Sequence, residues 1–265
     1  MDGFSLEIAP PLARLRLTRP ERRNVVTRVM WRALPDLCRQ IEAAPEALVV
    51  IVEGEGAHFS AGADITEFEA AYRDAATTHE YLQSIQDGLA ALIALPRPTI
   101  AALRGNSIGG GLALGLCCDL RFCAEDVYLA ATPAKLGLLY GFAETRRLVE
   151  LVGPARAKDI LFTGRRLDAA EGLAIGLVDR TVETELLNEA VTAYALELAA
   201  LSQYSIRGTK LAVEAIARGL TKETPAFRAL IESATRGEDS IEGRTAFAAK
   251  RPPRFAFRGR IDPIA

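Results

Sequence analysis

The chain has 265 residues, of which 49% are hydrophobic and 25% are charged. This balance is typical of a globular protein with a substantial core, and it excludes a disordered chain. Lysine and arginine together number 32 and aspartate and glutamate 34, which gives a net charge of −2. Because there is no basic excess, the chain has no general electrostatic attraction to nucleic acid, and we expect no nucleic-acid partner.

The cysteine pattern and the N-terminus indicate a cellular compartment. The first ten residues contain Asp2 and Glu7 and lack the basic start and long apolar core of a signal peptide. The most apolar stretch, 98–118, is interrupted by polar residues, so we expect no membrane span. The four cysteines form no CxxC pair, which predicts buried reduced thiols and no metal site. Reduced thiols without an export signal indicate the cytoplasm.

The first part of the chain alternates between predicted strands and helices. Alternating apolar and basic residues predict a half-buried strand over 12–17, and helical spacing predicts a helix over 27–43. A continuous apolar run over 47–52 predicts a strand that is buried on both faces. A periodic segment over 74–95 predicts the next helix, and 99–103 is the next buried strand.

The alternation continues with a glycine-rich turn at 105–111, an apolar helix at 112–118 and a strand at 120–123. Strands that alternate with helices in this way predict an α/β layer fold. The rest of the chain is expected to be nearly all helix, apart from a short strand at 177–182. The amphipathic helices over 184–250 are of the kind that packs on a partner domain or another subunit.

Two short motifs follow successive predicted strands: FSAGADI at 59–65 and GNSIGGG at 105–111. Each places free backbone N–H groups at the carboxyl end of a strand, and the small residues allow close approach to the backbone. The second motif also begins a helix, whose N-terminus is partially positive. Two N–H groups aimed at one point form an oxyanion hole for an enolate or a tetrahedral intermediate. The alternative is two plain turns, but their occurrence on successive strands favours the oxyanion hole.

In this order and spacing, the motifs resemble the signature of the crotonase (enoyl-CoA hydratase/isomerase) family. The resemblance extends through Arg19-Pro20, Asn24, Thr132-Pro133, Leu136-Gly137, Thr145-x-Arg147-Leu148, Gly153-x-x-x-Ala157 and the tail from Glu242-Gly243 through Phe247 to Lys250-Arg251. It implies an α/β core of repeated ββα units, a crotonase-like spiral, at 1–195. It also implies a C-terminal helical oligomerisation region at 196–265 that builds a homotrimer or a dimer of trimers.

The resemblance further implies that the substrate is an acyl-CoA thioester and that no separate cofactor is needed. By position in the family, the backbone N–H groups of Ala63 and Gly110 would hold the thioester oxygen. The segment that contains Ala61, Asp64 and Ile65 would face the adenine of coenzyme A.

Four further residues match family positions that contact coenzyme A. Arg22 or Arg23 corresponds to the basic loop that meets the phosphates. Phe247 and Lys250 correspond to tail residues that reach the coenzyme A bound by a neighbouring subunit. For the three basic residues, a solvated surface charge is the alternative interpretation.

The sequence departs from the family at two positions where a hydratase carries glutamate. The residue three places after the oxyanion glycine is Ala113, and the residue directly after Pro133 is Ala134. Adding water to a double bond needs a base for the water and an acid for the α-carbon. Alanine supplies neither, so hydration through these positions is not expected.

Two residues of the loop 138–144 are unusual for the family and offer replacements. A tyrosine at Tyr140 resembles the methylmalonyl-CoA decarboxylase branch, although that branch has a histidine where Ala63 stands. Loss of CO₂ leaves an enolate that an oxyanion hole stabilises, and Tyr140 would orient the leaving carboxylate. The alternative for Tyr140 is a pocket-wall aromatic residue whose hydroxyl group is satisfied.

Glu144 offers a second route, because a carboxylate in an apolar pocket acts as an acid or base. It would permit isomerisation by one group, or a displaced form of hydration. The alternative is a solvated glutamate at a helix N-terminus. The remaining polar residues are less indicative: His58 either flanks coenzyme A or is inert, His79 lies on the surface, and Asp119 braces the fold.

The leading hypothesis is therefore a CoA-thioester lyase or isomerase that works through an enolate, with a narrow preference for decarboxylation of a malonyl-type thioester assisted by Tyr140. The nearest rival is hydratase or isomerase chemistry through Glu144. A rival of another class is a non-catalytic acyl-CoA-binding protein that kept the family fold.

Overall fold

The computed structural model describes residues 3–261 of the chain. The strands are β1 (Phe4–Ala9), β2 (Leu12–Leu17), β3 (Val49–Gly54), β4 (Thr99–Leu103), β5 (Asn106–Ile108), β6 (Leu120–Ala124), β7 (Tyr128–Ala130) and β8 (Arg180–Val182). The helices are α1 (Arg28–Ala43), α2 (Phe68–Ala71), α3 (Ala75–Ile93), α4 (Gly110–Leu116), α5 (Phe142–Thr163), α6 (Ala169–Ala174), α7 (Leu187–Ala200), α8 (Gln203–Ala217), α9 (Pro225–Arg236) and α10 (Glu238–Ala248).

The main sheet has six strands in the order β1-β2-β3-β4-β6-β8, and β5 pairs with β7 in a second, smaller layer. Only β1 and β2 are antiparallel; the other pairs in both layers are parallel. Parallel bridges from Val26 to Ala63 and from Ser60 to Ser107 extend the smaller layer. Each main strand from β2 to β6 is thus followed by an extended segment of the smaller layer and then by a helix. This is the repeated ββα arrangement that the family resemblance implied.

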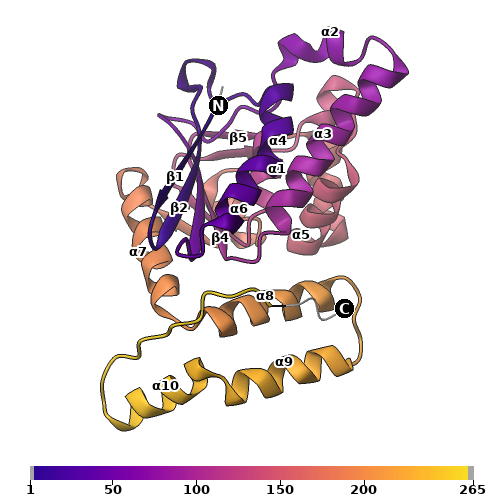
Figure 1. Ribbon diagram of the computed structural model, residues 1–265. Coiled ribbons are helices and arrows are strands. Elements are labelled where there is room, and N and C mark those ends of the chain that lie inside the picture. The colour runs from indigo at the N-terminus through magenta and orange to yellow at the C-terminus, as the bar shows by residue number, and fades with distance from the viewer. Residues whose placement is uncertain (1–2, 262–265) are drawn as a thin grey trace.

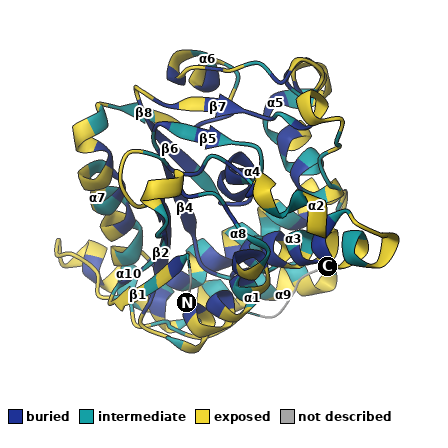
Figure 2. Ribbon diagram, turned by 90° about the horizontal axis from the view of Figure 1, so that it is seen from above, coloured by how far each residue is buried: buried dark blue, intermediate teal, exposed yellow. Residues whose placement is uncertain are grey.

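The central strands are buried on both faces, as their continuous apolar runs predict. In β3, Val50 and Val52 belong to the larger core cluster, which α1, α3 and α4 cover. Val49 and Ile51 point to the opposite face and pack in a second cluster with residues of α7. Figure 2 shows β4, β6 and α4 as the buried centre, with more exposed helices around them.

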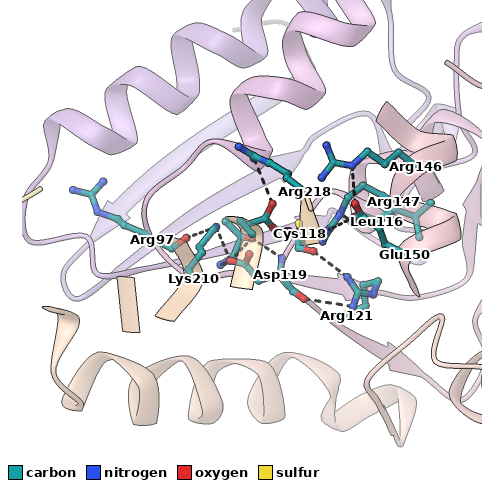
Figure 3. Close-up of polar contacts among 12 residues, drawn as sticks. Arg97, Leu116, Cys118, Asp119, Arg121, Arg146, Arg147, Glu150, Lys210 and Arg218 are labelled. Carbon is teal, nitrogen blue, oxygen red and sulfur yellow. Dashed lines mark hydrogen bonds and ion pairs between the residues drawn. The ribbon is translucent and has the colours of Figure 1, made fainter. Parts of the chain in front are cut away.

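Helices α8, α9 and α10 lie below the core in Figure 1. Lys210 of α8 joins them to the core through an ion pair with Asp119, at 2.7 Å from Nζ to Oδ2 (Figure 3). Asp119 also accepts hydrogen bonds from the backbone N–H and the hydroxyl group of Thr99. The predicted brace is therefore confirmed for Asp119. The predicted boundary between residues 195 and 196 falls inside α7, and the division into two regions stays a prediction.

Several elements differ from the sequence-based expectation. The strand expected at 177–182 is shorter, because the N–H groups of Leu177 and Val178 bond to the carbonyl of Gly172 and close the turn after α6. The helix expected at 112–118 begins earlier, at Gly110, and ends at Leu116. The strands β1, β5 and β7 were not predicted. Among the described residues, no helix is long and apolar enough to cross a membrane.

Candidate active site

The first motif forms a turn that is fixed by buried hydrogen bonds. The Ser60 hydroxyl group donates to the carbonyl of Asn24 at 2.7 Å and accepts from the N–H of Gly62 at 3.2 Å. The Asn24 amide in turn donates to the carbonyls of Glu55 and His58. These buried bonds hold the turn rigid at the carboxyl end of the sheet, where ligands bind in open α/β folds.

The second motif turns sharply between β5 and α4. Gly109 has φ +53° and ψ −122°, a backbone conformation that is open to glycine and strained for other residues. Its N–H donates to the carbonyl of Ala130 in β7 at 2.8 Å. The turn places the first N–H groups of α4, which have no partner within the helix, at the same edge as the first motif.

The backbone amides of Ala63 and Gly110 border one small space. A Cβ atom built on Gly110 would lie 3.5 Å from the Ala63 nitrogen and 3.1 Å from Cζ2 of Trp31. Within residues 3–261, neither the Ala63 N–H nor the Gly110 N–H has an acceptor in the protein. Two free donors that face one point can hold an oxygen that gains negative charge. The two amides therefore border the same space, as an oxyanion hole requires, and the oxyanion hole itself stays a prediction.

These amides open into a cavity of about 450 Å³ between α3, the segment 61–68 and the loop 132–142. Its walls are mainly apolar and aromatic; they include Trp31, Phe68, Tyr72, Tyr81, Ile85 and Leu138. The rings of Phe68, Tyr72 and Tyr81 contact one another at centroid separations of 5.1 to 6.4 Å. A cavity of this size and character suits an acyl chain or a small ring.

Glu144 lies in the wall of this cavity and is only 6% exposed. One carboxylate oxygen accepts from the N–H of Gly141 at 3.2 Å, and the other accepts from the Gln86 amide at 2.9 Å. The first contact is a helix-capping interaction, so the expected position at the N-terminus of α5 is correct. The alternative of a solvated glutamate is wrong, because α3 covers the side chain. Among the described residues that line the cavity, Glu144 alone carries a carboxyl group.

Tyr140 also lines the cavity, and its hydroxyl group donates to the carbonyl oxygen of Gly109 at 2.8 Å. A phenol has a single proton to donate. Burial raises the pKa of Tyr140, and the nearby Glu144 carboxylate raises it further. The phenol therefore stays protonated and bonded to the oxyanion turn, which agrees with the interpretation of a pocket-wall tyrosine whose hydroxyl is satisfied.

The two alanines that replace the family glutamates do not line the cavity. Ala113 is buried inside α4, and Ala134 is exposed in the short turn 133–136. Sequence reasoning missed Gln86, which holds Glu144. Its signal was helical spacing: Tyr81, Leu82, Ile85 and Gln86 share one face of α3, and Gln86 is the only amide on that face.

Of the three residues predicted to contact coenzyme A near the first motif, two line the cavity and the third is buried. Ala61 and Ile65 line the cavity, and Ile65 is exposed. The Asp64 carboxylate is buried and faces inward, 3.2 Å from Arg19 and 3.6 Å from Arg22. Burial acts to raise the pKa of Asp64, but hydrogen bonds from Thr66 and Arg19 lower it below its ordinary value overall. Asp64 is thus occupied inside the protein.

The remaining predicted contacts are spread along the chain. Arg22 and Arg23 are exposed, and the Arg23 carbonyl accepts from the N–H of Ala61 at 2.8 Å. Phe247 is 88% exposed at the end of α10, and Lys250 is exposed just beyond it. Figure 1 places α10 at the opposite end of the molecule from α2 and α3, so one chain does not bring this tail to its own cavity. A contact with a neighbouring subunit's coenzyme A stays a prediction.

The histidines and cysteines take no part in the cavity. Nδ1 of His58 accepts the N–H of Asn106 at 3.1 Å, and burial lowers the pKa of His58. His79 is exposed, as predicted. All four cysteines are free and buried, also as predicted. In the described part of the chain, no three His, Cys, Asp or Glu side chains are grouped so that they could hold a metal ion.

The site and the fold agree with similarity to known proteins. The family model described as enoyl-CoA hydratase/isomerase matches residues 7–258. A crystal structure of an enoyl-CoA hydratase/isomerase family protein from Hyphomonas neptunium is similar with a TM-score of 0.93 and 41% identity, covering 96% of this chain and 98% of that one. A second, an enoyl-CoA hydratase/carnitine racemase from Magnetospirillum magneticum, has a TM-score of 0.92 and 34% identity, covering 97% and 96%.

Among related sequences, the mitochondrial enoyl-CoA hydratase domain-containing protein 2 of Bos taurus is 34% identical over 254 residues, which cover 92% of this chain and 84% of the relative. A match over nearly the whole chain, in sequence and in structure, establishes the family. The chain belongs to the enoyl-CoA hydratase/isomerase family, which is the crotonase superfamily.

Proposed function

We propose that this protein isomerises an enoyl-CoA thioester through an enolate that the N–H groups of Ala63 and Gly110 stabilise. Glu144 is the acid and base. The observation that carries the proposal is the arrangement around one cavity: two free backbone donors on one wall and a single buried carboxylate on another.

The chemistry needs only one proton-transferring group. The Glu144 carboxylate removes a proton from C2 of a 3-enoyl thioester, and the electron pair moves onto the thioester oxygen as a dienolate. The same group returns the proton at C4, which leaves the double bond between C2 and C3. Hydration would need a second group to activate water, and Ala113 and Ala134 supply none.

Gln86 supports this role because it keeps the carboxylate in place. Its amide N–H donates to Glu144, and its carbonyl oxygen accepts the N–H of Ala143 at 3.4 Å. The side chain is therefore bonded at both ends of its amide, which limits the rotamers of the carboxylate that it holds. A proton-transferring group works best when its position relative to the substrate is fixed.

Decarboxylation of a malonyl-type thioester is the second candidate. In its favour, the enolate chemistry needs no base, and Tyr140 lines the cavity. Two observations weigh against it. The Tyr140 proton is already donated to the Gly109 carbonyl. A substrate carboxylate in this cavity would also be repelled by the Glu144 carboxylate. A non-catalytic acyl-CoA-binding protein is the third candidate.

The proposal extends to how coenzyme A is held. Arg22 and Arg23 meet the phosphates at the cavity mouth, and Phe247 and Lys250 of a neighbouring copy close over the adenine in a homotrimer or dimer of trimers. A cytoplasmic location is part of the proposal, because all four thiols are free.

The test is a panel of crotonyl-, 3-enoyl-, methylmalonyl- and ethylmalonyl-CoA, followed by mass spectrometry and proton NMR. We expect 3-enoyl-CoA to convert to the 2-enoyl isomer, and Glu144→Gln to lower kcat by about 10²–10⁴. Glu150→Gln, on the exposed side of the same helix, is the control and should keep its activity. Loss of CO₂ from a malonyl thioester would establish the second candidate, whereas tight binding without turnover would establish the third.

A further inference from the structure

The peptide unit between Gly109 and Gly110 carries one of the two oxyanion donors. In a trans peptide, the carbonyl of one residue and the N–H of the next lie in one plane and point in opposite directions. Any group that holds the Gly109 oxygen therefore fixes the direction of the Gly110 N–H. Both residues of this peptide unit are glycines, so neither has a side chain that could restrain the orientation of the unit.

The Gly109 oxygen accepts two hydrogen bonds. One comes from the N–H of Ala113 at 3.0 Å and is the first bond of α4. The other comes from the hydroxyl group of Tyr140 at 2.8 Å. Tyr140 lies in the loop that follows the turn 133–136. Since a carbonyl oxygen has no proton, the phenol must be the donor in this contact.

The phenol is suited to act as a permanent donor. Burial raises the pKa of Tyr140, with a further contribution from Glu144, so the hydroxyl group keeps its proton at neutral pH. The ring packs against the larger core cluster, which restricts its movement.

We infer that Tyr140 is a positioning residue of the oxyanion hole: its hydroxyl group polarises and aims the Gly109–Gly110 peptide so that the Gly110 N–H binds the thioester oxygen more strongly. This inference rests on the proposed function, because it assumes that a thioester oxygen occupies the space between Ala63 and Gly110. Condensed-phase estimates give a strengthening of about 10–30% per bond when hydrogen bonds form a chain. A donor on the carbonyl therefore makes the N–H at the other end of the same peptide a better donor.

The inference gives Tyr140 a different role from the one expected from sequence. In the role expected from sequence, the phenol would touch the leaving carboxylate of a substrate. Here it acts through the backbone and need not touch the substrate. It also connects the segment that leads into α5, which carries Glu144, to the turn that leads into α4, which carries Gly110. The proton-transferring group and the oxyanion donor thereby keep one relative position.

The test measures the carbonyl stretching frequency of a bound saturated acyl-CoA, labelled with ¹³C at the thioester carbon, by difference infrared spectroscopy. In the wild-type protein the oxyanion donors lower this frequency relative to free thioester. We expect Tyr140→Phe to return the frequency part of the way to the free value and to lower kcat about twofold to tenfold, with KM nearly unchanged. Tyr204→Phe removes a phenol that donates to the carbonyl of Leu230 in the C-terminal helices, and should change neither quantity.

A second variant keeps the ring and the fold intact. Replacing Tyr140 with 3,5-difluorotyrosine makes the phenol a stronger donor, and we expect the carbonyl frequency to fall below the wild-type value. Opposite shifts for the two variants support the inference. It is overturned if both leave the frequency unchanged, or if Tyr140→Phe abolishes turnover without moving the frequency, since the phenol would then touch the substrate. The infrared measurement needs binding only, so it stands even if the protein turns over no enoyl-CoA.

Discussion

The two walls of the cavity are built in different ways. On one wall, Ala63 and Gly110 contribute backbone N–H groups that the strand ends and the start of α4 fix in place. On the other wall, Glu144 contributes a side chain whose position depends on a partner from a distant helix, Gln86 of α3. The first wall is set by local backbone conformation and the second by tertiary packing. We therefore expect the two walls to respond differently to substitution.

The backbone wall should be the more sensitive to small changes of shape. In Gly110→Ala, the added methyl group would occupy the space beside the Ala63 nitrogen and press on Trp31. We expect kcat to fall by about 10²–10³, as when an oxyanion donor is lost. Steady-state kinetics with the best substrate of the panel measure this effect.

Gly208→Ala is the matched control for that change. Its added Cβ would make only ordinary contacts with Leu230, the nearest at 3.6 Å, and α8 lies outside the cavity. It should keep full activity and fold as well as the wild-type protein. Equal activity of Gly110→Ala and Gly208→Ala would show that the space between the two amides is not used.

The side-chain wall should depend on Gln86. In Gln86→Leu, the Glu144 carboxylate loses a hydrogen bond of the charged kind, worth about 1.5–3 kcal/mol. We expect kcat/KM to fall about tenfold to a hundredfold, because Gln86 no longer fixes the position of the carboxylate. Gln83→Leu, one turn earlier on α3 and bonded only to Asp87, is the control. An unchanged kcat/KM in Gln86→Leu would show that this hydrogen bond does not position Glu144 for proton transfer.

The C-terminal tail gives a smaller effect that also tests assembly. If Phe247 stacks on the adenine of a neighbouring copy's substrate, Phe247→Ala should raise KM about tenfold and leave kcat unchanged, because stacking on a base is worth about 1–3 kcal/mol. Phe162→Ala removes another largely exposed ring, from α5, and should leave KM unchanged. A KM that does not respond to Phe247→Ala would exclude the contact between subunits.

The smallest effect concerns stability in mild acid. Burial lowers the pKa of His58, whose neutral Nδ1 accepts the N–H of Asn106. The contribution of neutral His58 to the free energy of unfolding is therefore complete above the ordinary histidine pKa of about 6.5. It is lost as the pH falls through the lower pKa that His58 has in the folded protein. Urea unfolding between pH 7.5 and 5 should show a steeper loss of stability for wild type than for His58→Asn. Parallel curves would contradict this role.

Much of the fold could be predicted because the central strands are continuous apolar runs. Val49 to Val52 are buried on both faces, as expected for a short, β-branched apolar run in a parallel sheet. The strands β5 and β7 were missed because three residues give no periodicity, and their pairing across the chain is a tertiary effect. The strand β1 was missed because its residues are mostly exposed at the sheet edge.

The same contrast holds for the site. Ala63 and Gly110 could be proposed because two turns of small residues follow successive strands and resemble the family motifs, and their role stays a prediction. The burial of Glu144 could not be predicted, because the sequence at 141–144 reads equally as a solvated helix start. Its partner Gln86 comes from a helix 58 residues away in sequence, and only the packing of α3 against α5 brings the two together.

The most direct test of the account is deuterium exchange at C2 of a saturated acyl-CoA in D₂O, followed by mass spectrometry. Formation of an enolate between Ala63 and Gly110 with Glu144 as base predicts that the wild-type protein incorporates deuterium. Gly110→Ala and Glu144→Gln should each exchange at least about a hundredfold more slowly. Exchange at the wild-type rate in Glu144→Gln would contradict the account, and so would the absence of exchange in a wild-type protein that binds the thioester.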